Sequence, residues 1–484
     1  MDSNYVEKIT KDVIHEMVHD ADGSSETAFI DPQVERRCWM KYDLIVLPQL
    51  AILILLGYLD RSNIGNARVM GLETDLGLTG TQFNNLGSLF FVAYSVVMIP
   101  WAICVKKIGA NRTVAIATIS WSAITIGTGF CHNYHQIVAC RLLLGVFEAC
   151  LAAAYPIYLG NIYPRQMQSK RMASLFYGIS ASGAFGGLIA YAIQIMGDRM
   201  GLAAWRWLFV IEGGVSLFFG LVSYVSLPVK PATAWFLTAK ERATMVAIRE
   251  RDTAYWGKEE FEWKYLRITL MDPLVWFTAF MGFFTAFPIL GFNLFAPTLI
   301  LDMGYSRLQA NYLSVPLYAM GTLSLALITY FSDRLNRRGF MMIFPLCLGA
   351  LGYAIALGQE NPRVGYLGMF FVAAGIYPTG VLHISWVNNN MAPDSKRTVS
   401  IPIVMTFTLV SGVMSSQLYP SKDAPRYMMG NGISLGGIVA ASCAVGVLWT
   451  VWRRRNARKE KLIAEGVTVD NYEDDRGLGF KYVL

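Results

Sequence analysis

The feature that most constrains this chain is a succession of twelve apolar runs, each long enough to cross a membrane as a helix. A bilayer core about 30 Å thick is crossed by about 20 apolar residues in helical form. The chain is 54% hydrophobic and only 15% charged, far more apolar than a soluble domain. The sequence therefore predicts an all-α integral membrane protein with twelve transmembrane helices. The runs lie at 44–65, 82–105, 113–131, 135–159, 172–196, 205–227, 274–301, 309–331, 340–358, 363–390, 398–418 and 428–452.

Basic residues predict how these helices are oriented. Lys and Arg accumulate in short cytoplasmic loops, and an even number of spans leaves both termini on one side. We therefore expect a multi-pass membrane protein with both termini in the cytoplasm. We attribute the net charge of +7 to this bias, so we expect a lipid bilayer around the chain and no nucleic acid as partner. The basic positions are Arg36, Arg37, Lys41, Lys106, Lys107, Arg112, Arg165, Lys170, Arg171, Arg334, Arg337, Arg338, Lys396, Arg397, Arg453, Arg454 and Arg455.

A polar stretch between the sixth and seventh runs divides the chain into two halves. Within it, residues 238–252 are predicted to form a short amphipathic helix at the cytoplasmic face, with Thr238 as its N-cap. We interpret the stretch as a linker, with a regulatory domain as the alternative. The predicted units are a tail at 1–43, a six-helix bundle at 44–227, a central loop at 228–272, a second six-helix bundle at 273–452 and a tail at 453–484.

The two halves share an echo that indicates an internal repeat. The fourth run leaves the membrane through Pro164 and a Ser-Lys-Arg triplet at 169–171, and the tenth leaves through Pro393 and the same triplet at 395–397. Parallel repeats of six helices are typical of the major facilitator fold. We therefore expect a twelve-helix major facilitator fold built from two six-helix halves.

Several activities are not expected from this sequence. The seven cysteines show no metal-ligand or disulfide spacing. The first 30 residues are polar and contain no apolar run, so no cleaved signal peptide is expected. We find no Ser-His-Asp arrangement and no phosphate-binding loop in the required context. We expect no enzymatic activity, no metal and no cofactor.

Two adjacent charges in the first run are candidate functional residues. An ionisable side chain inside a membrane costs a few kcal/mol, so each one needs a partner, a water-filled cavity or a function. Asp60 and Arg61 diverge by about 100° on a helix, so the two charges point in different directions. We expect one to handle protons and the other an anion. The alternative is that both cap the helix at the outer interface.

The fourth run contains a second candidate pair. Arg141 and Glu148 are two turns apart and share a helix face with Gly145 between them, a face that we expect to line a central cavity. A carboxylate beside a guanidinium changes protonation when a substrate competes for the guanidinium. The alternative is a permanently paired strut between helices. For Glu212, in the sixth run, we favour a structural carboxylate that is hydrogen-bonded within the bundle.

The tenth run supplies candidate ligand contacts. His383, Trp386 and Asn390 share one helix face at spacings of three and four residues. An indole wall and an amide donor suit a planar or carboxylated ligand. The alternatives are that His383 only packs, and that the asparagines at 388–390 satisfy the end of the helix.

A charged loop follows the eighth run. Asp333 there is predicted to pair with Arg337 or Arg338, with Arg334 beside them, and to gate the transporter by stabilising one conformation. The equivalent loop of the first half, 105–112, has no acidic residue. Gating contacts of this type are therefore expected to be asymmetric.

Taken together, these residues resemble the fungal anion:cation symporters of the major facilitator superfamily, the allantoate permease group. The resemblance spans nearly the whole chain. It is carried by LDRSNIGNA at 59–67, RLLLGVFE at 141–148, WRWLFVIEG at 205–213, GIYP at 375–378, the segment 385–390, the pair 396–397 and GFKYVL at 479–484.

The resemblance implies proton-driven uptake, across the plasma membrane, of a small organic anion such as allantoate, nicotinate or pantothenate, by a protein that functions as a monomer. It assigns proton handling to Asp60 and Glu148, and anion binding or coupling to Arg61 and Arg141. It also assigns substrate contact to Asn390. The tenth run departs from the family pattern at three positions, His383, Asn388 and Pro393, which puts the identity of the substrate in doubt.

Two other functions fit the same fold. One is proton-driven export of an acidic secondary metabolite, because nothing in the sequence sets the direction of transport. The other is a nutrient sensor that binds without transport, although sensors usually carry a longer signalling tail than the 32 residues at 453–484.

Overall fold

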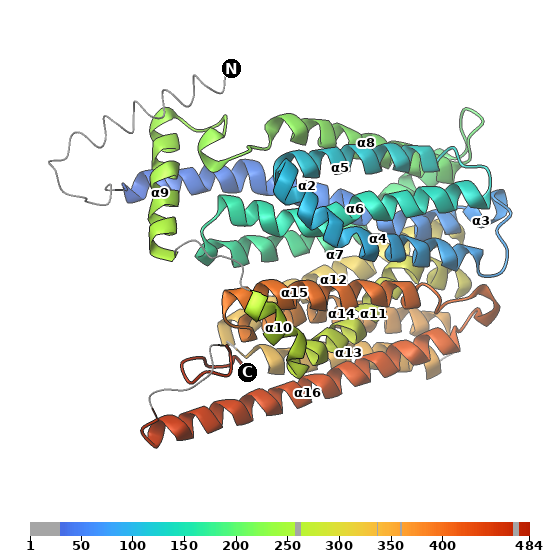
Figure 1. Ribbon diagram of the computed structural model, residues 1–484. Helices are drawn as coiled ribbons and strands as arrows, with labels where there is room; N and C mark the ends of the chain where they lie inside the picture. The colour runs from blue at the N-terminus through green and yellow to red at the C-terminus, as the bar shows by residue number, and fades with distance from the viewer. Residues whose placement is uncertain (1–29, 257–262, 336, 359–360, 468–473) are drawn as a thin grey trace.

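The computed structural model describes residues 30–256, 263–335, 337–358, 361–467 and 474–484. In these residues the chain is helical, and twelve long helices run side by side (Figure 1). They are α2 (Pro32–Val69), α4 (Gln82–Ile108), α5 (Ala110–Thr128), α6 (Tyr134–Ile162), α7 (Arg165–Met196), α8 (Ala204–Ser226), α11 (Pro273–Asp302), α12 (Arg307–Leu335), α13 (Arg338–Gly358), α14 (Pro362–Asn390), α15 (Asp394–Ser415) and α16 (Met428–Ala464). Shorter helices are α3 (Leu72–Asp75), α9 (Ala239–Trp256) and α10 (Trp263–Met271).

The long helices are suited to a bilayer. Nine of those in the described residues are long and apolar enough to cross a membrane by composition alone, and α4, α5 and α7 pack beside them. In hydrocarbon, every backbone polar group must be satisfied within the protein, which a helix does by itself. Large apolar side chains point outward, such as Val225 and Leu44, which are 83% and 73% exposed. The predicted all-α fold with twelve membrane helices is confirmed.

Two helices are longer than their apolar runs. α2 begins at Pro32 and α16 ends at Ala464, each about three turns beyond the run that predicted it. The extra turns carry basic residues and continue out of the hydrocarbon region. Hydropathy locates the membrane crossing, whereas the helix ends where other segments pack against it.

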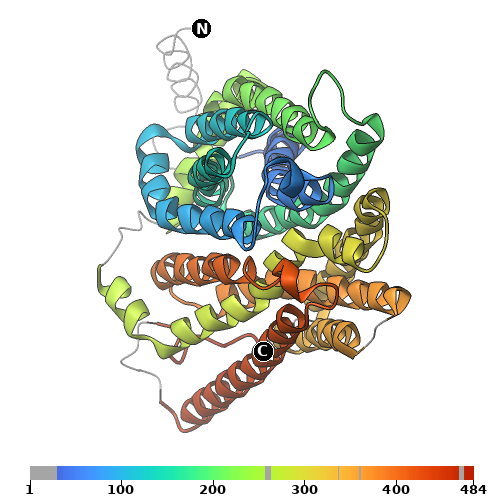
Figure 2. The same cartoon turned by 90° about the vertical axis from the view of Figure 1, so that its right-hand side faces the viewer.

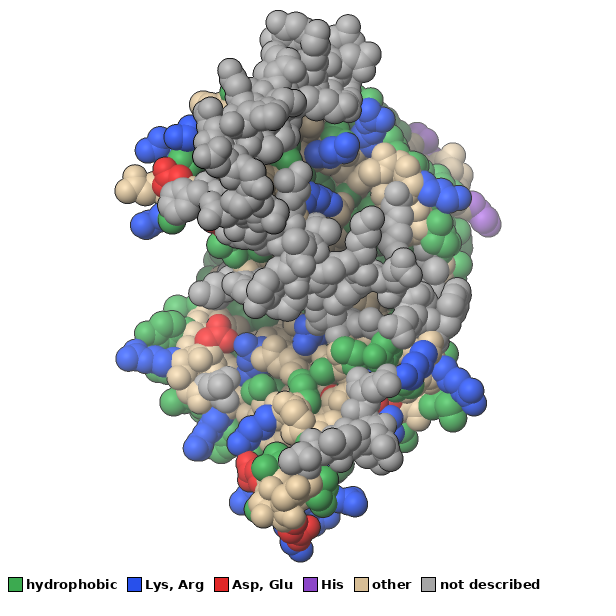
Figure 3. Space-filling model, turned by 60° about the vertical axis from the view of Figure 1, so that its left-hand side comes forward, with side chains coloured by type: hydrophobic (Ala, Val, Ile, Leu, Met, Phe, Trp, Pro, Cys, Tyr) green, Lys and Arg blue, Asp and Glu red, His purple; other side chains and the backbone are tan. Residues whose placement is uncertain are grey.

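The twelve helices form two bundles of six. The N-terminal bundle contains α2 and α4–α8, and the C-terminal bundle contains α11–α16, stacked below it in Figures 1 and 2. The start of α2, the C-terminal segment 474–484 and α9 lie at one end of the bundles, which we name the termini side. The opposite end, at the right of Figure 1, is the α3 side. Lys and Arg side chains of both bundles gather on the termini side (Figure 3).

The bundles touch closely on the α3 side. A Cβ at Gly65 of α2 would lie 2.3 Å from the carbonyl oxygen of Leu294 in α11, so only glycine allows this approach. Gly187 of α7 makes a similar approach to α12, where a Cβ would lie 2.9 Å from the carbonyl oxygen of Asn311. The space between the two bundles is therefore closed on the α3 side. The middle of the bundles lies between these contacts and the termini side.

The linker folds back onto the N-terminal bundle. α9 begins after Thr238, whose hydroxyl accepts from the backbone N–H of Glu241 at 3.4 Å, while the Glu241 carboxylate accepts from the Thr238 N–H at 2.8 Å. This reciprocal arrangement satisfies the free N–H groups at the start of the helix. Glu241 also pairs with Lys41 of α2 at 2.7 Å. The short helix is thus fixed to the first membrane helix.

Candidate functional site

A central cavity lies between the two bundles. Helices α2, α4, α6, α7 and α11 form its wall. On the α3 side it is closed by Gly87 and Leu294, which belong to the close contacts between the bundles. The lining residues are Tyr58, Arg61, Ser62, Ile64, Leu86, Gly87, Phe90, Phe91, Arg141, Ser182, Gly183, Leu290, Asn293 and Leu294.

An ion pair lies beside this cavity, with Arg61 in the cavity wall. Nε of Arg61 lies 2.7 Å from Oε2 of Glu148, and Glu148 is 1% exposed. The guanidinium also packs over the rings of Tyr58 at 4.4 Å and Tyr94 at 4.7 Å, an attraction that persists where water is excluded. The second carboxylate oxygen of Glu148 is buried and has no hydrogen-bond partner in the described part of the chain. The ion pair is therefore held in place, but one oxygen of its carboxylate lacks a hydrogen bond among the described residues.

Arg141 lies in the cavity wall without a close carboxylate. Its Nε and Nη2 are buried and have no hydrogen-bond partner among the described residues. The guanidinium packs over the ring of Phe209 at 5.5 Å. The expected direct contact between Arg141 and Glu148 is not formed, because Glu148 bonds to Arg61 of α2 instead, and Arg141 interacts with Glu148 only electrostatically, at longer range. Spacing along α6 placed the two charges on one helix, but it could not show which neighbouring helix approaches that helix.

Two further carboxylates lie deeper in the N-terminal bundle. Asp60 is 2% exposed and accepts from the hydroxyl of Thr125 at 3.1 Å. Glu212 is 3% exposed and accepts from the side-chain amide of Asn63. Asp60 interacts electrostatically with Glu148, Glu212 and Arg141, so these groups form one cluster. Asp60 therefore does not cap the outer end of α2, as the alternative interpretation required.

The C-terminal bundle contributes different residues from those expected. Asn293 of α11 lines the cavity, and its side-chain oxygen accepts from the hydroxyl of Tyr377. The sequence analysis missed Asn293, although a single amide within the long apolar run 274–301 was a usable signal. Ser182 of α7 also lines the cavity. The wall of the C-terminal bundle therefore has an amide and aliphatic groups but none of its own charges among the described lining residues.

The three candidates on α14 are not in the cavity wall. His383 is 1% exposed, and its Nε2 lies 3.0 Å from the carbonyl oxygen of Thr278, so it joins α14 to α11. Trp386 donates from its indole N–H to the carbonyl oxygen of Val483 at 2.9 Å. Asn390 donates to the same oxygen at 3.0 Å. In this conformation these side chains hold other parts of the protein, and we do not propose them as ligand contacts.

The candidate gating residues lie on the termini side of the C-terminal bundle. Asp333 pairs with Arg338 at 3.3 Å rather than with Arg337, which is exposed. Arg334 donates to the hydroxyl of Tyr330 at 3.1 Å. Arg338 also donates to the carbonyl oxygen of Ser385 at 3.0 Å. Among the described residues, these contacts lie within one bundle.

A contact between bundles was not foreseen. Arg68, near the end of α2, is 8% exposed, pairs with Glu73 at 3.0 Å, and donates to the hydroxyl of Ser421 in the opposite bundle at 2.8 Å. Its guanidinium packs over the ring of Phe83 at 4.4 Å. The positive charge at the end of the first run could have indicated a position at the boundary. Its partner, more than 350 residues away, could not be predicted.

Comparison with known proteins gives the same fold and a family. Residues 50–416 match the Major Facilitator Superfamily. Similar relatives include an uncharacterized transporter of Schizosaccharomyces pombe, 34% identical over 100% of this chain and 97% of the relative. Another is the high-affinity nicotinic acid transporter of Saccharomyces cerevisiae, 30% identical over 93% of this chain and 85% of the relative.

Solved structures agree with this fold. The D-xylose-proton symporter superposes with a TM-score of 0.67 at 16% identity, covering 83% of this chain and 97% of that one. A bacterial homologue of the lysosomal transporter Spinster, inward-facing and unoccupied, superposes with a TM-score of 0.63 at 15% identity, covering 83% and 94%. At this identity, the likeness concerns the fold alone. The family match covers most of the chain, and so the protein belongs to the Major Facilitator Superfamily and is a membrane transporter rather than an enzyme.

Proposed function

We propose that this protein is a proton-coupled transporter of a small organic anion that carries a carboxylate. The observation that supports this most is that Arg61, paired with the buried Glu148, shares the wall of the central cavity with Arg141, two of whose nitrogens have no hydrogen-bond partner among the described residues. A guanidinium presents parallel N–H donors that match the two oxygens of a carboxylate. The guanidinium of Arg141 is thus available to the substrate, and that of Arg61 becomes available when Glu148 is protonated.

Coupling follows from the charges of the cluster. Asp60, Glu148 and Glu212 are buried with two guanidiniums, so the fully ionised cluster has one more negative than positive group. An uncompensated charge in a membrane interior is costly. Transfer of one proton to Glu148 removes its charge and releases Arg61 to the substrate carboxylate. Anion and proton then bind together, so the loaded centre has the same net charge as the empty, fully ionised cluster, and the substrate adds no further charge as the bundles move.

The substrate class rests on the relatives and on the cavity. A relative covering most of the chain is a high-affinity nicotinic acid transporter. The wall contains aromatic rings, among them Tyr58 and Phe90, next to the guanidiniums, and this suits a compact acid with a planar or apolar body. We propose nicotinate, pantothenate, allantoate or a related acid as substrate. Because one chain contains the complete cavity, we propose that it works as a monomer.

The direction and location are part of the proposal. Basic side chains gather on the termini side, which we place in the cytoplasm. The structure is closed on the α3 side, and a structural neighbour is described as inward-facing. We therefore propose that the present conformation is the inward-facing one of a plasma-membrane importer.

The decisive experiment is proton-driven uptake of labelled nicotinate and related acids into vesicles containing Glu148→Gln. Glutamine imitates the protonated carboxyl, so we expect gradient-driven accumulation to be lost while exchange of label at constant pH remains. The matched control is Glu460→Gln, an exposed carboxylate near the end of α16 that pairs with Lys481 and lies outside the cavity, which should accumulate label as the unmodified protein does. Accumulation by Glu148→Gln with unchanged pH dependence would refute the coupling role. Binding without accumulation by the unmodified protein would indicate a sensor.

A further inference from the structure

The C-terminal segment, residues 474–484, is docked on the termini side of the C-terminal bundle. The backbone of Val483 is held from α14 in both directions: its carbonyl accepts from Trp386 and Asn390, and its N–H donates to Oδ1 of Asn390 at 2.7 Å. Trp386 and Asn390 are 0% and 1% exposed. Trp386 and Asn390, which the sequence analysis predicted to contact a ligand, are thus hydrogen-bonded to the backbone of this chain.

Helix α16 holds the same segment from the other side. The side-chain amide of Asn456 donates to the carbonyl of Tyr482 and accepts from its N–H, both at 2.9 Å. The ring of Tyr482 is nearly parallel to that of Trp452, with centroids 5.9 Å apart. Lys459 donates to the carbonyls of Asp475 and Phe480 at 2.7 Å. Since most of these bonds go to backbone atoms, they fix the path of the segment.

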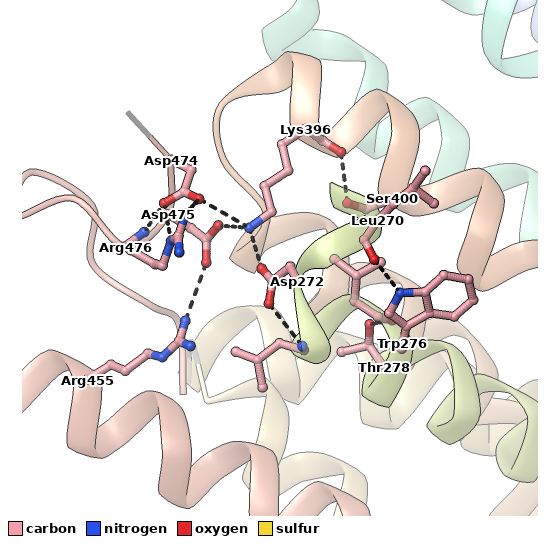
Figure 4. A network of polar contacts seen from close by, with 12 residues as sticks. Leu270, Asp272, Trp276, Thr278, Lys396, Ser400, Arg455, Asp474, Asp475 and Arg476 are labelled. Carbon is pink, nitrogen blue, oxygen red and sulfur yellow. Dashed lines mark hydrogen bonds and ion pairs between the residues drawn. The ribbon is translucent and has the colours of Figure 1, made fainter. Parts of the chain in front are cut away.

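A buried lysine extends the attachment to two more helices. Nζ of Lys396, at the start of α15, lies 2.5 Å from a carboxylate oxygen of Asp272, the N-cap residue of α11. It also bonds to Asp475 and lies 3.8 Å from Asp474, and its side chain is fully buried (Figure 4). A buried lysine requires partners of this kind, because an uncompensated buried charge is costly. The segment therefore connects the ends of α11, α14, α15 and α16.

The N-terminal bundle has an equivalent attachment. Residues 228–249, the linker segment, also follow a sixth helix and dock on the fourth helix of their bundle: Tyr158 of α6 donates to the carbonyl of Pro228 at 3.0 Å, and Arg249 donates to the carbonyl of Asn161 at 3.1 Å. The first helix takes part as well, since Tyr42 donates to the carbonyl of Pro231 at 2.6 Å. The same arrangement in both halves argues for a role shared by both.

The C-terminal segment reaches the candidate gating loop through α14. A Cβ at Gly339 would lie 2.6 Å from the ring of Trp386, so the start of α13 rests directly on that ring. Next to it, Arg338 bonds to the carbonyl of Ser385 and to Asp333. The backbone of Val483, the indole of Trp386 and the facing ends of α12 and α13 thus form one continuous series of contacts.

We propose that the C-terminal segment positions the facing ends of α12 and α13, through Trp386, and makes the termini-side end of the C-terminal bundle move as one rigid body during transport. Alternation between conformations moves whole bundles, and rigid-body motion requires that helix ends stay in register. Trp386 and Asn390 are then positioning residues. This inference rests on membership of the transporter family and is independent of the substrate.

The direct test measures a distance within the C-terminal bundle. Spin labels replace Leu335 at the end of α12 and Ile463 near the end of α16, both more than half exposed, in a background with Cys347→Ser and Cys443→Ser. We expect a narrow distance distribution in this protein and a broader one after Asn390→Ala. Amides of 474–484 should exchange about ten-fold faster in that variant, because bonds to Val483 are lost.

The matched control is Lys481→Ala, in the same segment, whose side chain is 76% exposed and pairs only with the surface residue Glu460. It should leave the distance distribution narrow. The distance distribution of Asn390→Ala is measured on folded protein only, so that a lower yield of this variant does not affect the result. An unchanged distribution in Asn390→Ala, despite faster exchange of the segment, overturns the proposal.

A second measurement separates positioning from a ligand contact. In vesicles, Asn390→Ala should lower the maximal rate of nicotinate uptake about ten-fold with KM unchanged, because movement rather than binding is slowed. A raised KM with an unchanged maximal rate would assign Asn390 to the substrate and contradict the inference. If the unmodified protein moves no nicotinate, the proposed substrate fails, and the distance measurement still decides on the C-terminal segment.

Discussion

Two arginines face the same cavity in different states. Arg61 is engaged by Glu148, whereas Nε and Nη2 of Arg141 have no hydrogen-bond partner among the described residues. An unpaired buried guanidinium is costly, and an incoming carboxylate would relieve that cost. We therefore regard Arg141 as the primary contact for the anion and Arg61 as the contact that depends on the proton.

Replacement of Arg141 by lysine should weaken binding strongly. Lysine keeps the charge but loses the planar fork, so a bidentate contact worth about 1.5–3 kcal/mol becomes a single bond. We expect KM for nicotinate to rise about ten-fold or more in Arg141→Lys. The control is nicotinamide, which lacks the carboxylate. It should compete poorly with labelled nicotinate for uptake, both by the unmodified protein and by Arg141→Lys. Equal competition by acid and amide would contradict carboxylate recognition.

The residues that the sequence located best are the charged ones, because a charge inside a membrane helix costs free energy. A buried charge in a membrane helix needs a reason, and this principle found Asp60, Arg61, Arg141 and Glu148 without any tertiary information. The pairing of Glu148 with Arg61 required knowledge of which helices meet. The periodicity of α14 likewise placed Trp386 on one face but could not show that a segment about 97 residues further along covers that face.

At the scale of single elements, the attachment of α9 to α2 should depend on pH. Burial opposes ionisation of Glu241, but its hydrogen bonds with Lys41 and Thr238 outweigh burial and lower the pKa of this carboxyl below its ordinary value of 4.5. Because the pKa is lowered in the folded state, the stabilisation is complete above 4.5. It is lost as the pH falls through the lowered pKa.

A spin label at the exposed Lys240 would report this detachment. We expect the label to become more mobile as the pH is lowered below about 4.5. In Glu241→Gln, mobility should already be raised at neutral pH and should not change with acidification. A transition of equal size in that variant would show that another group controls the attachment.

The close approach of α2 and α11 should control closure on the α3 side. A methyl group at Gly65 would meet the Leu294 carbonyl, and overpacking of this kind costs about 1–3 kcal/mol. We expect Gly65→Ala to shift the population away from the present conformation by about ten-fold. Spin labels at the exposed Met200 and Met429 would detect separation of the bundles. Gly127→Ala, where nothing lies within 4 Å, should cause none.

The membrane helices themselves were predictable because hydrocarbon permits few structures. Apolar runs of sufficient length must be helical, and their number fixed the class of fold. Their termini-side ends were less predictable. The last three turns of α16, for example, are basic and would read as a solvated tail, and they are helical where the C-terminal segment packs on Asn456 and Lys459.

For the whole molecule, the proposed orientation makes a simple prediction. Basic residues resist translocation, so both ends of the chain should lie in the cytoplasm. Epitope tags placed at the two ends should bind antibody only after cells are permeabilised. A tag inserted at Met200, in the exposed turn between α7 and α8 on the α3 side, should bind antibody on intact cells. Binding to an end tag on intact cells would reverse the orientation.

The two docked segments also have a consequence for the order in which the protein is made. Each docked segment comes later in the chain than all the helices to which it is bonded. A bundle therefore cannot be completed until its own segment has left the ribosome. The linker segment precedes the first helix of the C-terminal bundle, and so the N-terminal half can reach its final packing while the other half is still being synthesised. A nascent chain that ends at α16 would contain all twelve membrane crossings, and yet Lys396 would still lack Asp475, and Trp386 and Asn390 would still lack the backbone of Val483.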